Sequence, residues 1–190
     1  MDVRQSHHFK QLFKVLELLG YSAESDSMHV ELGFMSLPSG AISTRSGNTI
    51  SLKALLEEAE VRALAVINEK NPNLPRKEVI SKQVAIAAIK YFDLSHNRKT
   101  EIEFTWEKAI SFEGNTGPYL QYTHARIHGI LKKANQELPE TRSSNTEEFG
   151  GSESLVLRKL LQWNEILEMA GKDVFPSTIC NYLFELASVF

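Results

Sequence analysis

A short run at residues 41–48, AISTRSGN, combines hydroxyl groups, one guanidinium and a glycine. Groups of this kind can bind phosphate oxygens, because an anion is stabilised by several converging donors and a planar guanidinium reaches two oxygens at once. The run lacks the Gly-Lys-Ser/Thr ending of a P-loop. On composition alone, an ordinary solvated loop is the commoner explanation of such a run. The candidate phosphate ligands in it are Ser43, Thr44, Arg45 and Ser46.

A second run, residues 117–134, has the sequence GPYLQYTHARIHGILKKA and is rich in aromatic and basic groups. Its apolar residues fall on one arc of a helical wheel, and a flanking stripe carries tyrosine, arginine and lysine. Aromatic rings can stack on nucleic-acid bases, and basic groups can contact phosphates. From spacing alone, an amphipathic helix whose tyrosines cover the edge of a core is the more common case. The stripe consists of Tyr119, Tyr122, Arg126 and Lys133.

The histidines and the single cysteine offer weaker signals. His7 and His8 are adjacent, so on a helix their side chains point apart and cannot bind one metal ion together. His124 and His128 have the i, i+4 spacing of a metal pair, but no nearby acidic or cysteine ligand completes a site. We therefore predict no metal centre. Cys180 lies in an apolar helical run, where a small core residue is the expected role.

The bulk composition excludes several classes of protein. The chain has 190 residues, a formal net charge of −3 and 42% hydrophobic residues, which is ordinary for a globular protein. There is no bulk basic character, although a local patch is sufficient for RNA binding. One cysteine excludes an internal disulfide and suits a reducing compartment. No run resembles a signal peptide or a membrane span, so we expect no membrane contact. We also expect a cytoplasmic protein and a monomer.

Apolar periodicity predicts a mainly helical chain. Residues 28–34 alternate apolar with other residues, which predicts a strand, and a long loop rich in Ser, Gly, Thr and Pro follows it. Ser51 can cap the next helix, and Gly117-Pro118 fits the N-cap and first position of another. The predicted helices cover residues 7–19, 52–70, 77–91, 105–110, 117–134, 153–170 and 177–190, with an extended piece at 101–104 and a polar linker at 135–152.

Four segments follow one another in a characteristic order: RQSHHFKQLFKVLELLGY, HVELGFMSLPSGAISTRSGNTISLKALLEEA, FEGNTGPYLQYTHARIHGIL and YLFELASVF. Together they resemble arginyl-tRNA synthetases over essentially the whole chain, and the third segment is the most specific. The resemblance implies the late part of a Rossmann-like class I catalytic domain in residues 1–72 and an all-helical anticodon-binding bundle in residues 73–190. It also implies ATP-dependent activation of arginine and transfer to tRNA(Arg), with arginine, ATP with Mg²⁺, and tRNA as ligands.

The resemblance carries over to a few residues. Gln5 matches the family's Gln-x-x-His-Phe position, where the amide lines the arginine pocket, and His8 matches a histidine near the ATP site. The sequence AISTRS stands where class I enzymes have Lys-Met-Ser-Lys-Ser, with Ala41 and Thr44 in place of the lysines. Arg45 is then the main cation of the loop and the candidate catalytic residue, holding the β- and γ-phosphates as pyrophosphate leaves. The anticodon-binding bundle would offer the tyrosine–basic stripe to tRNA.

Other features of the family do not occur in these residues. The class I signature His-Ile-Gly-His is absent, and so are the tyrosine and aspartate that complete the family's arginine pocket. We therefore expect a C-terminal fragment, cut short at Phe190, that holds no tightly bound cofactor and is inactive alone. The alternative is a non-catalytic tRNA-binding or helical interaction module derived from this fold.

Overall fold

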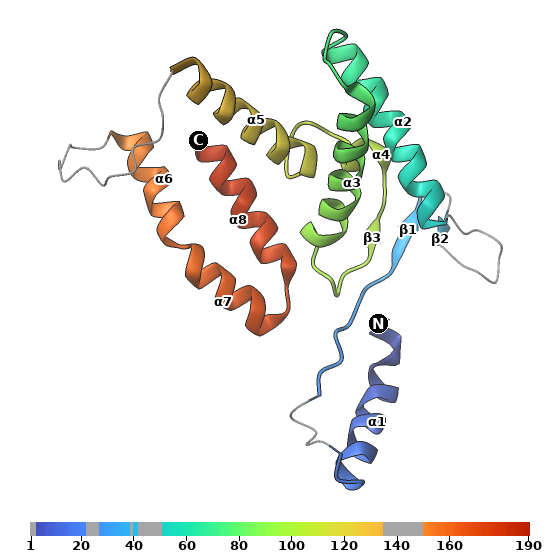
Figure 1. Ribbon diagram of the computed structural model, residues 1–190. Coiled ribbons are helices and arrows are strands. Elements are labelled where there is room, and N and C mark those ends of the chain that lie inside the picture. The colour runs from blue at the N-terminus through green and yellow to red at the C-terminus, as the bar shows by residue number, and fades with distance from the viewer. Residues whose placement is uncertain (1–2, 22–26, 39, 42–50, 135–149) are drawn as a thin grey trace. The chain divides into compact units, whose positions relative to one another are not determined.

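The computed structural model describes residues 3–21, 27–38, 40–41, 51–134 and 150–190 (Figure 1). The chain forms two compact units, each assembled from segments that are distant in sequence. The mixed unit, which contains helix and strand, consists of Met1–Ile50 and His96–Thr105. The helical unit consists of Ser51–Ser95 and Trp106–Phe190.

The mixed unit begins with a short 3-10 helix, Val3–Gln5, that runs directly into α1, Ser6–Leu18. The predicted first helix is confirmed, including its end before Gly20, whose φ of +75° favours glycine. A small sheet has the order β2-β1-β3, in which β1 is antiparallel to β2 and parallel to β3, with Ser36 opposite Glu103. The strands are β1 (Met35–Leu37), β2 (Gly40–Ala41) and β3 (Ile102–Glu103).

The strand predicted at residues 28–34 is misplaced, because the ladder lies immediately after it in β1, and within the predicted range Leu32 forms only an isolated bridge. Residues 28–34 are held instead by separate hydrogen bonds from two other segments. The Leu32 carbonyl accepts from the Val3 N–H (3.0 Å), and the Gly33 N–H donates to the Arg98 carbonyl (2.6 Å). The alternating pattern therefore marked an extended segment correctly but did not show which residues would find a partner strand.

The helical unit is built around α3, which packs along α2 and also contacts α5 and α8 (Figure 1). α8 packs against α6 and α7 as well. Alanines exposed by 1% or less lie on α2 and α3, where small side chains allow close approach of the two backbones: Ala59, Ala63, Ala85 and Ala88. No helix in the described part of the chain is long and apolar enough to cross a membrane. The helices are α2 (Leu52–Lys70), α3 (Lys77–Ser95), α4 (Trp106–Ala109), α5 (Gly117–Ala134), α6 (Gly151–Leu161), α7 (Trp163–Asp173) and α8 (Pro176–Val189).

Both ends of α2 follow their sequence signals. Ser51 has extended backbone, and its Oγ accepts a hydrogen bond from the Ala54 N–H (3.1 Å), which confirms the predicted cap. At the other end, Asn71 donates its N–H to the Ile67 carbonyl (2.8 Å) and is followed by Pro72. The residue before a proline avoids helical backbone, so the helix ends at Lys70 as predicted.

The helix predicted at residues 153–170 is two helices, α6 and α7, which are separated at Gln162. Gly171 does not end the second helix but lies inside it, with open space around it. The chain leaves the helix at Val174, which has the left-handed φ of +54°. Pro176 then occupies the first turn of α8, as expected for a residue whose N–H would have no helical partner there.

Candidate nucleic-acid interface

The start of α5 is fixed by three consecutive residues. Thr116 is its N-cap, because the Thr116 Oγ1 accepts a hydrogen bond from the Tyr119 N–H (3.2 Å). The same hydroxyl donates to the Ser111 carbonyl (2.6 Å), which closes the preceding loop. Gly117 is already the first helical residue, so the prediction of Gly117 as N-cap is wrong by one position. Pro118 is fully buried in the first turn, where its missing N–H leaves no broken helical bond.

Gly117 lies against the backbone of α3. A Cβ atom at this position would lie 2.6 Å from the Ala87 carbonyl oxygen and 3.0 Å from the Tyr91 Cβ. Both distances are shorter than normal van der Waals contact, so a side chain here would push the two helices apart. The glycine is therefore needed for close packing of α5 on α3 and not for an unusual backbone angle.

A polar network joins the loop before α5 to α3 and α8. The Tyr91 hydroxyl of α3 lies 2.6 Å from the Asn115 Oδ1 and 2.7 Å from the Cys180 carbonyl oxygen. Asn115 in turn meets Asn181, with 2.9 Å between the Asn115 Nδ2 and the Asn181 Oδ1. The network therefore connects Tyr91 to residues that lie 24 and 89 positions further along the chain.

The phenol of Tyr91 has one hydrogen and cannot donate it to two acceptors at once. A flip of the Asn115 amide resolves this, because its oxygen and nitrogen occupy equivalent places. In the flipped arrangement Asn115 donates to the phenol oxygen, and the phenol donates to the Cys180 carbonyl. The Asn181 amide must be flipped as well, so that its nitrogen donates to the Asn115 oxygen and each of these contacts is a proper donor–acceptor pair.

We expect Tyr91→Phe to lower the free energy of unfolding by about 0.5–1.5 kcal/mol at neutral pH, because it removes the hydrogen bonds of a partly buried phenol to Asn115 and to the Cys180 carbonyl. Burial, and to a smaller extent the nearby Cys180 side chain, raise the pKa of the Tyr91 phenol. The folded state therefore holds this proton more tightly than the unfolded chain, and stability falls as the pH rises above about 10. Denaturant unfolding across a pH series should show a weaker alkaline loss in Tyr91→Phe than in the wild type.

The control for this experiment is Tyr122→Phe, which removes a hydroxyl from an exposed tyrosine of the same unit. Its free energy of unfolding should stay within about 0.5 kcal/mol of the wild type. If Tyr91→Phe and the wild type lost stability equally above pH 10, the alkaline sensitivity would come from other groups.

The structure places the four residues of the tyrosine–basic stripe in two environments. Tyr119 is partly buried, and its ring packs edge-on against Phe184 of α8 with 5.6 Å between centroids. The Tyr122 side chain is 56% exposed, and Arg126 and Lys133 are exposed as well. Tyr119 thus contributes to the α5–α8 packing, and the accessible part of the stripe consists of Tyr122, Arg126 and Lys133.

α5 is locally basic although the chain has a net charge of −3. It contains Arg126, Lys132 and Lys133 and no carboxylate. Among the residues that the structure describes, no carboxylate pairs with these three cations. The two lysines also lie in the last turn, where positive charge stabilises a helix C-terminus. Arg126 lies near the middle of α5, where the helix dipole gives no reason for a cation, so it is the stronger candidate for a phosphate contact.

Gln5 and His8, the residues matched to the arginine and ATP sites, lie at the start of α1 in the mixed unit, and both are exposed. This turn is fixed by Ser6, whose Oγ donates to the Glu31 Oε1 (2.8 Å). That hydrogen bond lowers the pKa of the Glu31 carboxyl, and a hydrogen bond from the Lys99 side chain lowers it further by a smaller amount. The helix start is therefore tied to the segment before β1. The candidate loop residues Ser43, Thr44, Arg45 and Ser46 lie outside the described residues.

Cys180 lies in the core of the helical unit, as the apolar run around it in the sequence predicted. The residue is 6% exposed, and burial raises the pKa of its thiol. Little thiolate forms at neutral pH under these conditions, so the side chain is a poor nucleophile. Its backbone carbonyl is the part that contributes to the polar network around α5.

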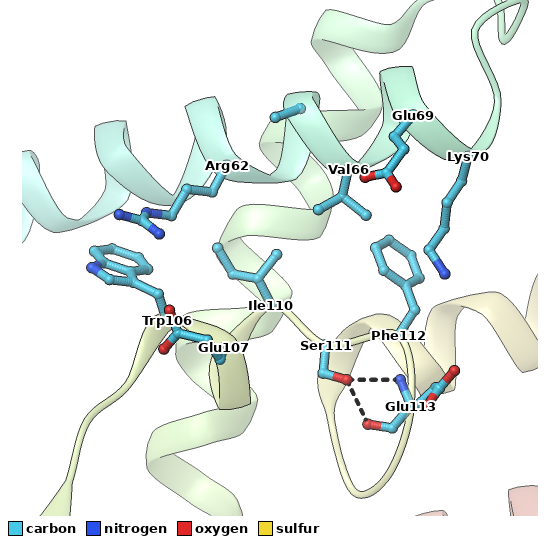
Figure 2. A pocket seen from close by; sticks show the side chains of 11 residues that line it. Arg62, Val66, Glu69, Lys70, Trp106, Glu107, Ile110, Ser111, Phe112 and Glu113 are labelled. Atoms are coloured by element: carbon cyan, nitrogen blue, oxygen red, sulfur yellow. Dashed lines mark hydrogen bonds between the residues drawn. The ribbon is translucent and has the colours of Figure 1, made fainter.

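A cavity of about 510 Å³ lies between α2 and the segment that leads from α4 to the loop before α5 (Figure 2). At one end the Arg62 guanidinium stands over the Trp106 ring, 4.9 Å from its centroid. At the other end the Lys70 ammonium lies 5.9 Å from the centroid of Phe112. Val66 lies between the two pairs on the α2 side (Figure 2). The cavity is thus bounded by two cation–aromatic pairs.

Sequence reasoning did not identify this cavity, and none of the predicted site residues lines it. Its only signal in the sequence is the aromatic pair Trp106 and Phe112 around a short helix. The aromatic faces are already covered by cations of the chain itself, and Arg62 is paired with Glu58 (2.6 Å). Carboxylates outnumber cations in the lining, which makes it less suited to RNA phosphates than α5. The lining carboxylates are Glu69, Glu107 and Glu113.

A family model described as tRNA synthetases class I (R), catalytic domain, matches residues 1–106, which is more than half of the chain. The chain belongs to the arginyl-tRNA synthetase family. A second model, described as the DALR anticodon binding domain, matches residues 120–190. The family predicted from the four sequence segments and the mainly helical fold class are therefore confirmed.

Individual relatives agree with this assignment. An arginine–tRNA ligase of Fusobacterium nucleatum is 43% identical over 98% of this chain, and one of Mannheimia succiniciproducens is 41% identical over all of it. The arginyl-tRNA synthetase structure of Thermus thermophilus matches 99% of the chain with a TM-score of 0.85 and 35% identity. The chain spans about a third of the length of each relative: 33%, 34% and 31% respectively.

The compact units and the family models divide the chain differently. The catalytic-domain model extends to residue 106 and so includes α2 and α3, which belong to the helical unit together with α5 to α8. The domain boundary predicted at residue 72 falls in the turn between α2 and α3. Because these two helices pack along each other, a division at the turn separates neighbours in space. The boundary at residue 72 between a catalytic and an anticodon-binding domain therefore stays a prediction.

Proposed function

We propose that this chain serves arginine–tRNA ligation, the ATP-dependent joining of arginine to tRNA(Arg), as a cytoplasmic monomer. The helical unit contacts tRNA through α5, and the mixed unit contributes to arginine activation with ATP and Mg²⁺. The observation that supports this most strongly is the order of the two domain matches, catalytic over residues 1–106 and anticodon-binding over residues 120–190. Relatives named arginine–tRNA ligase align with both parts.

Arginine activation requires attack of the arginine carboxylate on the α-phosphate of ATP, with pyrophosphate as the leaving group. Negative charge develops on the departing phosphates, and a guanidinium aimed at them stabilises the transition state. We assign this role to Arg45, the cation of its loop. Gln5 can orient the arginine substrate through a neutral amide, and His8 lies near the nucleotide in this proposal. Further donors to the phosphates are Ser43, Thr44 and Ser46.

The accessible part of the stripe suits a nucleic-acid backbone and its bases. The exposed Tyr122 ring can stack on an unpaired base, and Arg126 and Lys133 can contact phosphates. Tyr119 contributes to the position of this face, because its ring packs on Phe184 of α8. The Gly117 contact and the Tyr91 network hold the first turn of this helix against α3 and α8.

A non-catalytic tRNA-binding module is the second candidate. It is favoured by the sequence AISTRS, in which both lysines of the class I signature loop are missing. The two candidates share the tRNA face on α5 and differ in ATP-dependent chemistry. ATP–pyrophosphate exchange dependent on arginine, measured on the longest protein product that contains residues 1–190, is therefore the assay that distinguishes them, whereas tRNA binding tests the part that they share.

We expect the chain to bind tRNA(Arg) weakly and in a salt-dependent manner, because released counterions make phosphate contacts weaker as salt increases. Tyr122→Ala should weaken binding roughly 5- to 100-fold, the range that loss of one stacked base produces. Arg126→Ala should weaken binding and lower the slope of log K against log salt by about one. The measurement is fluorescence anisotropy with labelled tRNA(Arg) between about 50 and 200 mM salt.

The matched control is Arg158→Ala, which removes an exposed arginine from α6 instead of α5. Its tRNA affinity and salt slope should equal those of the unchanged chain. Absence of binding at the lowest salt concentration, or equal losses in the Arg126 and Arg158 variants, would show that α5 is not the tRNA face.

A further inference from the structure

His124 and His128 lie one turn apart on α5, and their side chains face each other. The two Nε2 atoms are 3.2 Å apart, and the ring centroids are 4.4 Å apart with 59° between the ring planes. Both residues are exposed. On the helical wheel the pair lies across the buried arc from Arg126, so it is separate from the stripe to which RNA binding is assigned.

Two arrangements can bring two imidazole nitrogens this close. In the first, one neutral ring donates its Nε2–H to the lone pair of the other, and the contact is a hydrogen bond at the long end of the usual range. In the second, both Nε2 lone pairs point to one cation, and both ring protons reside on Nδ1. In the second arrangement the Nε2 atom of each ring donates its lone pair to the cation, and each Nδ1–H can donate a hydrogen bond to water.

The distance between the nitrogens fits metal coordination. Zinc–nitrogen bonds are about 2.0–2.1 Å long, and two such bonds to nitrogens 3.2 Å apart enclose an angle of roughly 100° at the metal. This angle lies between the values for square-planar and tetrahedral coordination. We propose that His124 and His128 form a surface site for a divalent transition-metal ion of the zinc, nickel and copper class, bound through both Nε2 atoms. This proposal departs from the prediction of no metal centre, which was based on the lack of a third protein ligand, because the facing rings can chelate an ion whose other ligands are water.

The donor set determines which ions bind and how tightly. Imidazole nitrogen suits zinc, nickel and copper, whereas magnesium and calcium prefer oxygen ligands. In the described ranges, no group of three or more His, Cys, Asp and Glu side chains could hold a metal ion. Water therefore completes the coordination, and the site is an open, exchangeable one. A bound ion joins one turn of α5 to the next and stabilises the folded chain by mass action.

The test uses the full 190-residue chain without an affinity tag and titrates it with nickel or zinc chloride in a calorimeter. We expect one principal site per chain, with no comparable heat from magnesium chloride. His124→Ala and His128→Ala should each weaken binding at least about tenfold, because each leaves a single ligand in place of a chelate. The melting temperature should rise with nickel concentration in the wild type but not in either variant.

His7→Ala is the matched control, because it removes an exposed histidine from a helix position that has no second histidine one turn away. Its nickel affinity should equal that of the wild type. The proposal is overturned if the His124 and His128 variants bind nickel as tightly as His7→Ala. It is overturned equally if the wild type binds no nickel or zinc, in which case the two rings only hydrogen-bond to each other.

Discussion

Replacing Gly117 with alanine is expected to lower the free energy of unfolding by about 1–3 kcal/mol, near the upper end of that range. The new Cβ would lie 2.6 Å from the Ala87 carbonyl oxygen and 2.9 Å from its carbon, and these backbone atoms cannot rotate away. Relief of the clash requires α5 to move off α3. This movement would also stretch the contacts that Asn115 makes with Tyr91 and Asn181. Urea unfolding followed by far-ultraviolet circular dichroism measures the loss.

Gly129 provides the control within the same helix. A Cβ at Gly129 would have no neighbour within 4 Å, so alanine there adds no clash. Alanine is also the better helix former, and Gly129→Ala should raise stability by about 0.5–1 kcal/mol. The two substitutions should therefore have opposite signs. A Gly117→Ala chain as stable as the wild type would show that α5 and α3 do not require this close contact.

Replacing Arg45 with alanine is expected to raise the barrier to arginine activation by about 2–4 kcal/mol, the usual effect of losing one charged contact to a developing anion. The rate should fall roughly 30- to 1,000-fold. Because Arg45 is assigned to the ATP phosphates and not to the tRNA face, the affinity for tRNA(Arg) should change little. The assay is arginine-dependent ATP–pyrophosphate exchange by the longest protein product that contains residues 1–190.

Arg45→Lys is the informative companion of this substitution. It keeps the positive charge but loses the planar fork that binds two phosphate oxygens, so it should recover only part of the lost rate. An unchanged exchange rate in Arg45→Ala would place the necessary charge elsewhere. If the wild-type product shows no exchange, the non-catalytic tRNA-binding module becomes the better explanation.

Helices were predictable from the sequence because their signals are local. The apolar residues of α5 recur three, four or seven positions apart, and such spacing defines a buried arc whatever the helix packs against. The cap at Ser51 and the stop before Pro72 depend on neighbours within four residues. The sequence did not predict the break at Gln162, because no glycine or proline stands there. It predicted a helix end at Gly171 instead, although an exposed glycine is tolerated inside a helix.

For the candidate site, too, the sequence indicated which residues to consider, and tertiary packing decided which of them are accessible. Residue type and family motif were sufficient to select the stripe on α5, Gln5 and the Arg45 loop, since these depend on which side chains are present and in what order. The motifs did not show that Tyr119 packs on Phe184 of α8 while Tyr122 remains exposed. That difference depends on where α8 lies against α5, which no spacing within α5 can report.

The sequence by itself determined the family, the helical character of the chain, and the basic and aromatic composition of α5. Tertiary structure alone decided why Gly117 must be glycine, which residues bind Tyr91, and how the His124 and His128 rings face each other. It also decided that β1 pairs with a strand more than sixty residues away. The physical reason is range: helix periodicity and capping act between residues a few positions apart, whereas close packing joins surfaces whose residues are far apart in the chain.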